Sequence, residues 1–100
     1  MNYQHIKNHL DAKDIIVLDG ATGTELQRRG AQMDTAAWCG PASLTNSALL
    51  TEIHLDYINA GADVITANTF ASSRLMLTDA GFGDRVEEIN TIAVEAALRA

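Results

Sequence analysis

The sequence of 100 residues contains little cysteine, little basic charge and no long hydrophobic run. A single cysteine, Cys39, excludes an internal disulfide framework and cannot by itself form a cysteine-cluster zinc site. Seven Lys and Arg residues stand against 13 Asp and Glu residues, which gives a net charge of −6. The densest basic cluster is Arg28-Arg29, so the chain lacks the basic stripe of a nucleic-acid-binding protein and we expect no nucleic-acid partner.

The hydrophobic runs are too short to indicate a membrane segment. Residues 1–14 are polar and do not contain the apolar core of a signal peptide. The longest apolar run near the start covers only residues 15–18, whereas a helix that crosses a bilayer needs about 20 residues. We therefore expect no membrane partner and a cytoplasmic location.

The hydrophobic content of 47% is typical of a folded protein, and the length allows one small domain. Residues 1–14 form a polar lead-in, in which we expect no more than one helical turn. The continuous apolar run at 15–18 is typical of a strand that is buried on both faces. Apolar periodicity and turn signals then predict a helix at 23–29, a loop at 30–46, a helix at 47–60, a strand at 62–70, a helix from 72 or 73 to 80, and a helix that follows Asp84 to the end of the chain.

Several polar residues stand where helices are expected to begin. Thr22 with Glu25 and Asp84 with Glu87 have the spacing of a capping box, and Asn46 is the expected cap of the helix at 47–60. The alternation of strands and helices predicts an α/β fold with a parallel sheet and right-handed crossovers. Because two strands are too few for a stable sheet and the last helix has no stop signal, we expect the front part of a longer domain.

Asp19 and Gly20 follow directly after the first predicted strand. The carboxyl ends of parallel strands are the edge at which α/β proteins bind ligands. The Asp19 carboxylate could pair with a substrate amine, and the N–H groups of residues 20–23 could receive a carboxylate or a phosphate. Two alternatives stay open: Asp19 is a simple turn residue, or the chain is a non-catalytic α/β module that binds an anionic small molecule through residues 20–23.

A second group of polar residues follows the second predicted strand, at the same edge of the sheet. Thr66, Asn68 and Thr69 offer neutral hydrogen bonds, and Phe70 offers an apolar wall. The alternative is that Asn68 and Thr69 satisfy the backbone of the loop. Trp38 lies in the middle of the predicted loop at 30–46, where it is either a core residue or a lid over the pocket.

Four further residues have reactive side chains but no partners that the sequence reveals. His54 lies in an amphipathic helix, where we expect it to be structural and bonded to a carboxylate or a backbone group. His5 and His9 lack a third metal ligand, and Cys39 lacks a neighbouring base. We therefore expect no metal site and no nucleophile among them.

Several segments taken together resemble the homocysteine S-methyltransferase family: LDGATGTEL at 18–26, Arg29-Gly30, Trp38, and IHLDYINAGADVITANTF at 53–70. The resemblance implies that residues 15–100 are the first portion of a (β/α)₈ barrel, an N-terminal fragment that is inactive alone. It also implies methyl transfer to the homocysteine thiolate, giving methionine, from a donor such as S-methylmethionine. A zinc ion bound by three cysteines would hold the thiolate and keep the sulfur nucleophilic.

The family's zinc cysteines lie further downstream, in an Asn-Cys and a Gly-Cys-Cys segment, and Cys39 matches neither. The resemblance therefore predicts no metal ligands in this chain. It does predict one side of the pocket for homocysteine, with its amino-acid end at the first predicted strand and an aromatic loop residue near the substrate. The residues that match the family's pocket are Asp19, Gly20, Trp38, Thr66, Asn68, Thr69 and Phe70.

Overall fold

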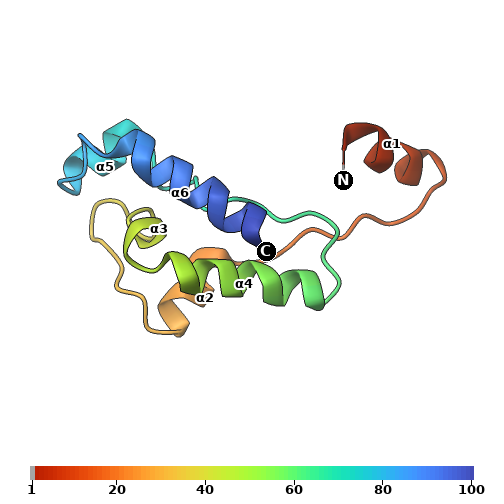
Figure 1. Ribbon diagram of the computed structural model, residues 1–100, viewed down its shortest axis with the longest axis horizontal. Helices are drawn as coiled ribbons and strands as arrows, with labels where there is room; N and C mark the ends of the chain where they lie inside the picture. Colours follow the sequence, from red (N-terminus) through yellow and green to blue (C-terminus); the bar gives the residue numbers. More distant parts are fainter. Residues whose placement is uncertain (1) are drawn as a thin grey trace.

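The structure is a computed structural model that describes residues 2–100. Three long non-helical segments connect its helices: residues 12–21, 29–41 and 60–73 (Figure 1). In chain order the helices are α1 (Tyr3–Asp11), α2 (Thr22–Arg28), α3 (Ala42–Thr45), α4 (Ser47–Asn59), α5 (Arg74–Asp79) and α6 (Val86–Arg99).

The predicted parallel α/β sheet, and with it the first portion of a (β/α)₈ barrel, is wrong for the residues that the structure describes. Residues 2–100 contain no strand; the segments predicted as strands at 15–18 and 62–70 meet at one isolated parallel bridge, between Leu18 and Val64. The backbone N–H of Asp19 donates to the Val64 carbonyl at 3.0 Å, and that of Val64 donates to the Val17 carbonyl at 3.2 Å. Each segment has only the other beside it, and a sheet needs more neighbours than this to be stable.

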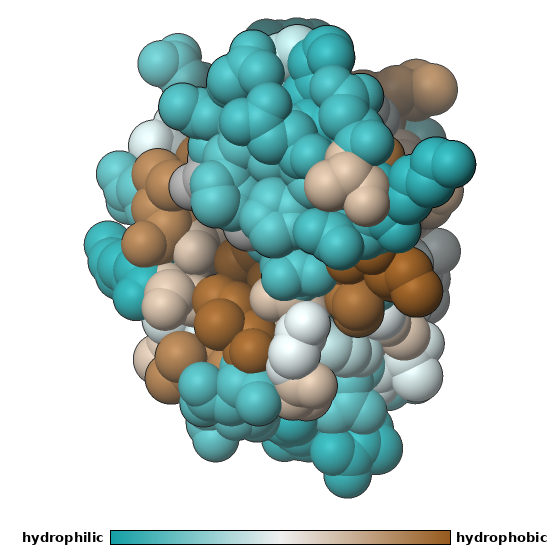
Figure 2. Space-filling view, turned by 90° about the vertical axis from the view of Figure 1, so that its right-hand side faces the viewer, coloured by the Kyte–Doolittle hydropathy of each residue, from teal (hydrophilic) through white to brown (hydrophobic). Residues whose placement is uncertain are grey.

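The apolar run that suggested a strand buried on both faces is exposed. Ile15, Val17 and Leu18 are 85%, 46% and 63% exposed. The face of the molecule shown in Figure 2 carries hydrophobic surface between hydrophilic regions above and below it. The apolar run at 15–18 was therefore predicted to be buried, but no helix or sheet of the described residues packs over it.

The polar lead-in forms more helix than expected, because α1 spans nine residues. The Asn2 side chain caps it by accepting a hydrogen bond from the His5 N–H at 2.9 Å, and Lys7 pairs with Asp11 across one turn at 2.6 Å. None of the helix residues is buried, and α1 lies apart from the other helices in Figure 1. The division of the chain after residue 14 stays a prediction.

Four of the helices lie where periodicity predicts them. The helices α2, α4, α5 and α6 agree with the expected ranges to within about two residues at most ends. Gly61 and Gly81 follow α4 and α5 with φ values of 113° and 88°, the left-handed conformation that ends helices. The short helix α3 was not predicted, because it lies inside the expected loop at 30–46.

The predicted capping boxes are wrong. Thr22 is the first helical residue of α2, and the Glu25 carboxylate bonds with Arg28 and Arg29 instead of reaching back to the helix start. At α6 the N-cap is Arg85 and not the predicted Asp84, and it makes no side-chain cap bond. Both patterns therefore mark the start of a helix correctly, but neither forms the side-chain cap that its spacing predicts.

Asn46 occupies the N-cap position of α4, as predicted, but its side chain makes no cap hydrogen bond. Its Oδ1 atom accepts from the Thr45 hydroxyl at 2.8 Å instead. Ser73 does cap α5, because its hydroxyl accepts from the Met76 N–H at 3.3 Å.

The core lies between α4 and α6, with α2 and α3 packed against it. Leu50 and Ile53 of α4 are fully buried, as the apolar face predicts, and each such side chain contributes roughly 1.5–3 kcal/mol. A smaller cluster joins Leu77 of α5 to Ile89 of α6. Within residues 2–100, no helix is both long enough and apolar enough to span a bilayer.

Candidate functional site

A cavity of about 250 Å³ lies between the turn at 19–23, the loop around Trp38 and the segment that follows Val64. It brings together six of the seven residues predicted from the sequence. Thr69 does not line it: this residue is exposed, and its N–H donates to the Ala67 carbonyl at 2.8 Å. The predicted residues that line the cavity are Asp19, Gly20, Trp38, Thr66, Asn68 and Phe70.

Two larger hollows lie elsewhere on the molecule, one of about 550 Å³ along α6 and one of about 370 Å³ beside Asp34. Neither is lined by a residue that the sequence singled out as a ligand contact. We favour the smaller cavity because polar and aromatic groups from three segments distant in the sequence converge on it, as they do in small-molecule sites.

Asp19 is both a structural residue and a cavity residue. Its Oδ2 atom accepts from the Thr66 N–H at 2.8 Å, and its Oδ1 atom accepts from the Thr66 hydroxyl at 3.1 Å. These bonds fix the carboxylate at the cavity wall. Because a carboxylate has about four acceptor sites, it retains the capacity to accept from a bound ammonium group.

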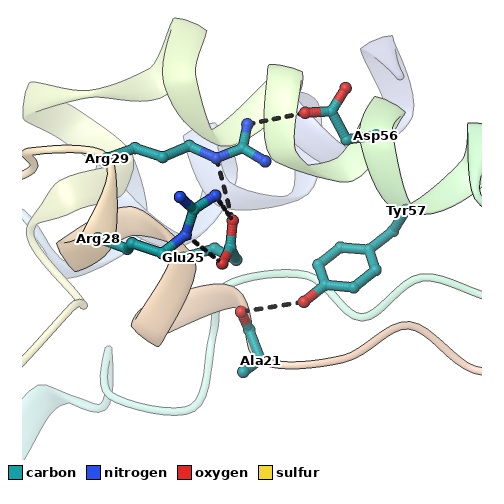
Figure 3. Close-up of polar contacts among 6 residues, drawn as sticks. All are labelled: Ala21, Glu25, Arg28, Arg29, Asp56 and Tyr57. Carbon is teal, nitrogen blue, oxygen red and sulfur yellow. Dashed lines mark hydrogen bonds and ion pairs between the residues drawn. The ribbon is translucent and has the colours of Figure 1, made fainter.

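The turn at 20–23 is supported from α4 by Tyr57, whose hydroxyl donates to the Ala21 carbonyl at 3.2 Å (Figure 3). A Cβ atom at Gly20 would lie 3.0 Å from the same hydroxyl oxygen, so the turn approaches the ring closely. Tyr57 was not among the residues predicted for the pocket. Anion binding by residues 20–23 stays a prediction.

Trp38 lines the cavity beside the first residues of α2. It lies against Gly23, where a Cβ atom would come within 2.6 Å of two ring carbons of the indole. The residue is 41% exposed and its φ of 47° is unusual for a residue with a side chain. Trp38 is therefore neither a fully buried core residue nor a lid free of the body.

Asn68 is buried, and its hydrogen bonds are made within the protein. The amide Nδ2 donates to the Cys39 carbonyl and to the Ser43 hydroxyl, both at 3.0 Å, and Oδ1 accepts from the Cys39 thiol at 3.4 Å. Phe70 is 84% exposed, so it stands at the rim. Sequence reasoning missed Ser43 because residues 30–46 have no period that would place it in a helix.

His54 is fully buried in α4, and neither ring nitrogen has a hydrogen-bond partner among residues 2–100. The prediction that it bonds to a carboxylate or a backbone group is therefore wrong for this part of the chain. Burial lowers the pKa of the imidazole, and the negative charge of Asp19 opposes this effect. The histidine is thus held in its neutral form.

An ion-pair cluster fastens α2 to α4 (Figure 3). Arg28 binds the Glu25 carboxylate through two bonds of 2.8 and 2.9 Å, and Arg29 reaches both Glu25, at 3.1 Å, and Asp56, at 2.8 Å. The hydrogen bond from Arg28 is the largest cause that lowers the pKa of Glu25, from 4.5 to about 2. The cluster thereby holds the helix that carries Gly23.

The described residues do not fit a zinc ion. Over residues 2–100 there is no group of three or more His, Cys, Asp or Glu side chains that could hold a metal. Cys39 is buried, which raises the pKa of its thiol, and the thiol donates to Asn68. No chemical step is therefore assigned to a metal on these residues, and the zinc ion implied by the resemblance stays a prediction.

The match to a family model and the matches to individual proteins point to the same family. The family model for homocysteine S-methyltransferase matches residues 16–100. A homocysteine S-methyltransferase of Escherichia coli (strain K12) is 43% identical over 77 residues, which cover 76% of this chain and 23% of that protein. Homocysteine S-methyltransferase 2 of Zea mays is 33% identical over 86 residues, 85% of this chain and 25% of that protein.

A selenocysteine Se-methyltransferase of Brassica oleracea var. italica is 32% identical over 85 residues, 84% of this chain and 25% of that protein. No solved structure matches the chain. The chain spans about a quarter of the length of these relatives. Since the family model matches most of its residues, this chain belongs to the homocysteine S-methyltransferase family.

Proposed function

We propose that the whole protein transfers a methyl group to the sulfur of homocysteine, giving methionine, and that the cavity beside Asp19 holds the amino-acid end of homocysteine. In the reaction the sulfur forms a bond to the methyl carbon, the bond between that carbon and the donor breaks, and the thiol proton is lost. A sulfonium donor such as S-methylmethionine is proposed from the family resemblance, and a cytoplasmic location from the short apolar runs of the sequence.

The observation that carries the proposal is the fixed carboxylate of Asp19 at a cavity with aromatic walls. Two bonds from Thr66 orient this carboxylate, and Trp38 and Phe70 line the same cavity. The substrate ammonium would donate to the carboxylate, a charge-assisted hydrogen bond worth roughly 1.5–3 kcal/mol. The aromatic side chains would cover the methylene groups that lead to the sulfur.

Asp19→Asn in the full-length protein tests the proposal, because it keeps the shape of the side chain and removes its charge. An amide at this position can still accept from the Thr66 N–H. We expect homocysteine to bind about 10- to 100-fold more weakly by titration calorimetry, since roughly 1.4 kcal/mol corresponds to a factor of ten.

Asp63→Asn is the matched control. Its Oδ2 atom accepts from the Val17 N–H at 2.9 Å, a bond like that of Asp19, but Asp63 does not line the cavity. Homocysteine affinity should therefore be unchanged. If Asp19→Asn lowers the melting temperature but binds homocysteine as tightly as the original protein, Asp19 is only a turn residue and the proposal fails.

A further inference from the structure

Asn68 fastens the loop that carries Trp38 to the wall of the cavity. Both of its N–H donors are used, one on the Cys39 carbonyl and one on the Ser43 hydroxyl, at 3.0 Å each. Its carbonyl oxygen accepts from the Cys39 thiol at 3.4 Å. Asn68, Ser43 and Cys39 are 6%, 0% and 2% exposed, so water does not compete for these bonds.

A second contact holds the same loop to the same segment. A Cβ atom at Gly40 would collide with the carbonyl oxygen of Ala71, so the two backbones touch at a place where only glycine fits. Gly40 directly follows Cys39, and Ala71 lies three residues after Asn68. The loop is therefore fixed at two neighbouring points.

Trp38 itself has a backbone conformation that needs such support. Its φ of 47° lies in the left-handed region, which a residue with a side chain rarely adopts. On the other side of the loop, the Trp38 carbonyl accepts from the Asp34 N–H at 2.8 Å. The Asp34 carboxylate in turn accepts from the N–H groups of Ala36 and Ala37, at 2.7 and 2.9 Å. A strained residue persists only where its surroundings fix it in this way.

We propose that Ser43 and Asn68 are positioning residues, which hold the indole of Trp38 against Gly23 and thereby set the shape of the cavity. In this role Asn68 acts through the loop, since both of its N–H donors and its carbonyl oxygen are engaged within the protein. That the shape of the cavity matters for methyl transfer rests on the proposed function. That these two residues hold Trp38 in place does not depend on the proposed function.

Trp38 is the only tryptophan of the chain, so its fluorescence reports on this one position. The variants are Asn68→Ala, which removes three hydrogen bonds, and Ser43→Ala, which removes one. We expect the Trp38 emission to shift to longer wavelength and acrylamide to quench it more strongly in both, with the larger change in Asn68→Ala. Circular dichroism should show that the helices are retained.

Ser72→Ala is the control. Ser72 is 1% exposed, and its hydroxyl donates to Asn90 Oδ1 at 2.5 Å, so the variant loses a buried hydrogen bond that does not involve the loop. Its melting temperature should fall while the Trp38 emission stays unchanged. Unchanged emission and quenching in Ser43→Ala and Asn68→Ala, with melting temperatures lowered as in Ser72→Ala, would overturn the proposal.

If Asn68→Ala does not fold, Ser43→Ala decides the question, because it removes only one hydroxyl. Homocysteine takes no part in the measurement. The fluorescence result would therefore be the same even if the protein did not bind homocysteine.

Discussion

Asp19 and Asp63 join the non-helical segments at 12–21 and 60–73, each accepting a hydrogen bond from the other's segment. Asp19 accepts from the backbone N–H of Thr66 at 2.8 Å, and Asp63 accepts from the backbone N–H of Val17 at 2.9 Å. Each carboxylate thus takes an N–H group of the opposite segment, on either side of the one parallel bridge. Side chains here satisfy donors that a longer sheet ladder would satisfy with carbonyl groups.

This arrangement predicts different effects for two substitutions at Asp63. Asp63→Ala leaves the Val17 N–H without its acceptor and should lower the free energy of unfolding by roughly 1 kcal/mol. Asp63→Asn keeps an acceptor oxygen in place and should cost less. Urea denaturation of both variants measures the difference. Equal losses of stability would show that the hydrogen bond to Val17 is not the source of the effect.

Gly23→Ala is expected to destabilise the protein, although alanine favours a helix by about 1 kcal/mol over glycine. The new Cβ atom would lie 2.6 Å from the Trp38 ring and 3.0 Å from the Cys39 sulfur. Overpacking of this kind costs roughly 1–3 kcal/mol, which exceeds the gain in helix propensity.

Thr24→Ala is the matched control for Gly23→Ala, since Thr24 is an exposed residue of the same helix. It should gain helix propensity without any collision and leave the melting temperature equal or slightly higher. A Gly23→Ala protein that is also stabilised, with the Trp38 fluorescence unchanged, would mean that the indole does not pack on Gly23.

The sequence predicted the helices better than the sheet, for a physical reason. A helix satisfies its backbone hydrogen bonds locally, so the apolar face with Leu50 and Ile53 was enough to place α4. A strand depends on neighbours, and the apolar run at 15–18 cannot show whether they are present in the chain. It therefore indicated burial for residues that are exposed, such as Ile15.

The cavity residues were predicted in part because they follow the two segments that meet. Asp19 and Thr66 come together beside the parallel bridge between Leu18 and Val64, although residues 2–100 form no sheet. What could not be predicted is the pairing of Asn68 with Ser43, since the two residues are 25 apart, with α4 between them, and share no periodic relationship. Nor could the sequence reveal that His54 is buried with no hydrogen-bond partner among residues 2–100.

His54 predicts a pH dependence of stability. Burial lowers its pKa in the folded protein, so the unfolded chain, with a value near 6.5, binds the proton more tightly. The stability that depends on neutral His54 is therefore fully present above pH 6.5 and is lost as the pH falls through the lower folded value. We expect the free energy of unfolding, measured in urea, to decrease from about pH 7 to pH 5.

His54→Leu should remove this part of the pH dependence. It should also raise stability at neutral pH by about 1–3 kcal/mol, because it deletes buried nitrogen atoms that have no hydrogen-bond partner in the described part of the chain. A variant that keeps the original slope between about pH 7 and pH 5 would assign the slope to another group.

Glu25 predicts a second pH dependence, at lower pH. The paired arginines lower its folded pKa from 4.5 to about 2, with the hydrogen bond from Arg28 as the largest cause. Because the unfolded chain binds this proton more tightly, the stabilisation is present above pH 4.5 and is lost as the pH falls through about 2. Glu25→Gln should therefore show a smaller drop in melting temperature across this range.

Glu88→Gln is the control that separates Glu25 from acid titration in general. The pKa of Glu88 is also lowered, by a hydrogen bond from Arg85, but this pair lies at the start of α6 and joins no second helix. Arg29, by contrast, connects Glu25 to Asp56 and so links α2 to α4. Added salt should weaken the Glu25 effect, since these ion pairs are near the surface. If Glu25→Gln melts with the same acid dependence as the original protein, while Glu88→Gln does not, the cluster between α2 and α4 is not what fails in acid.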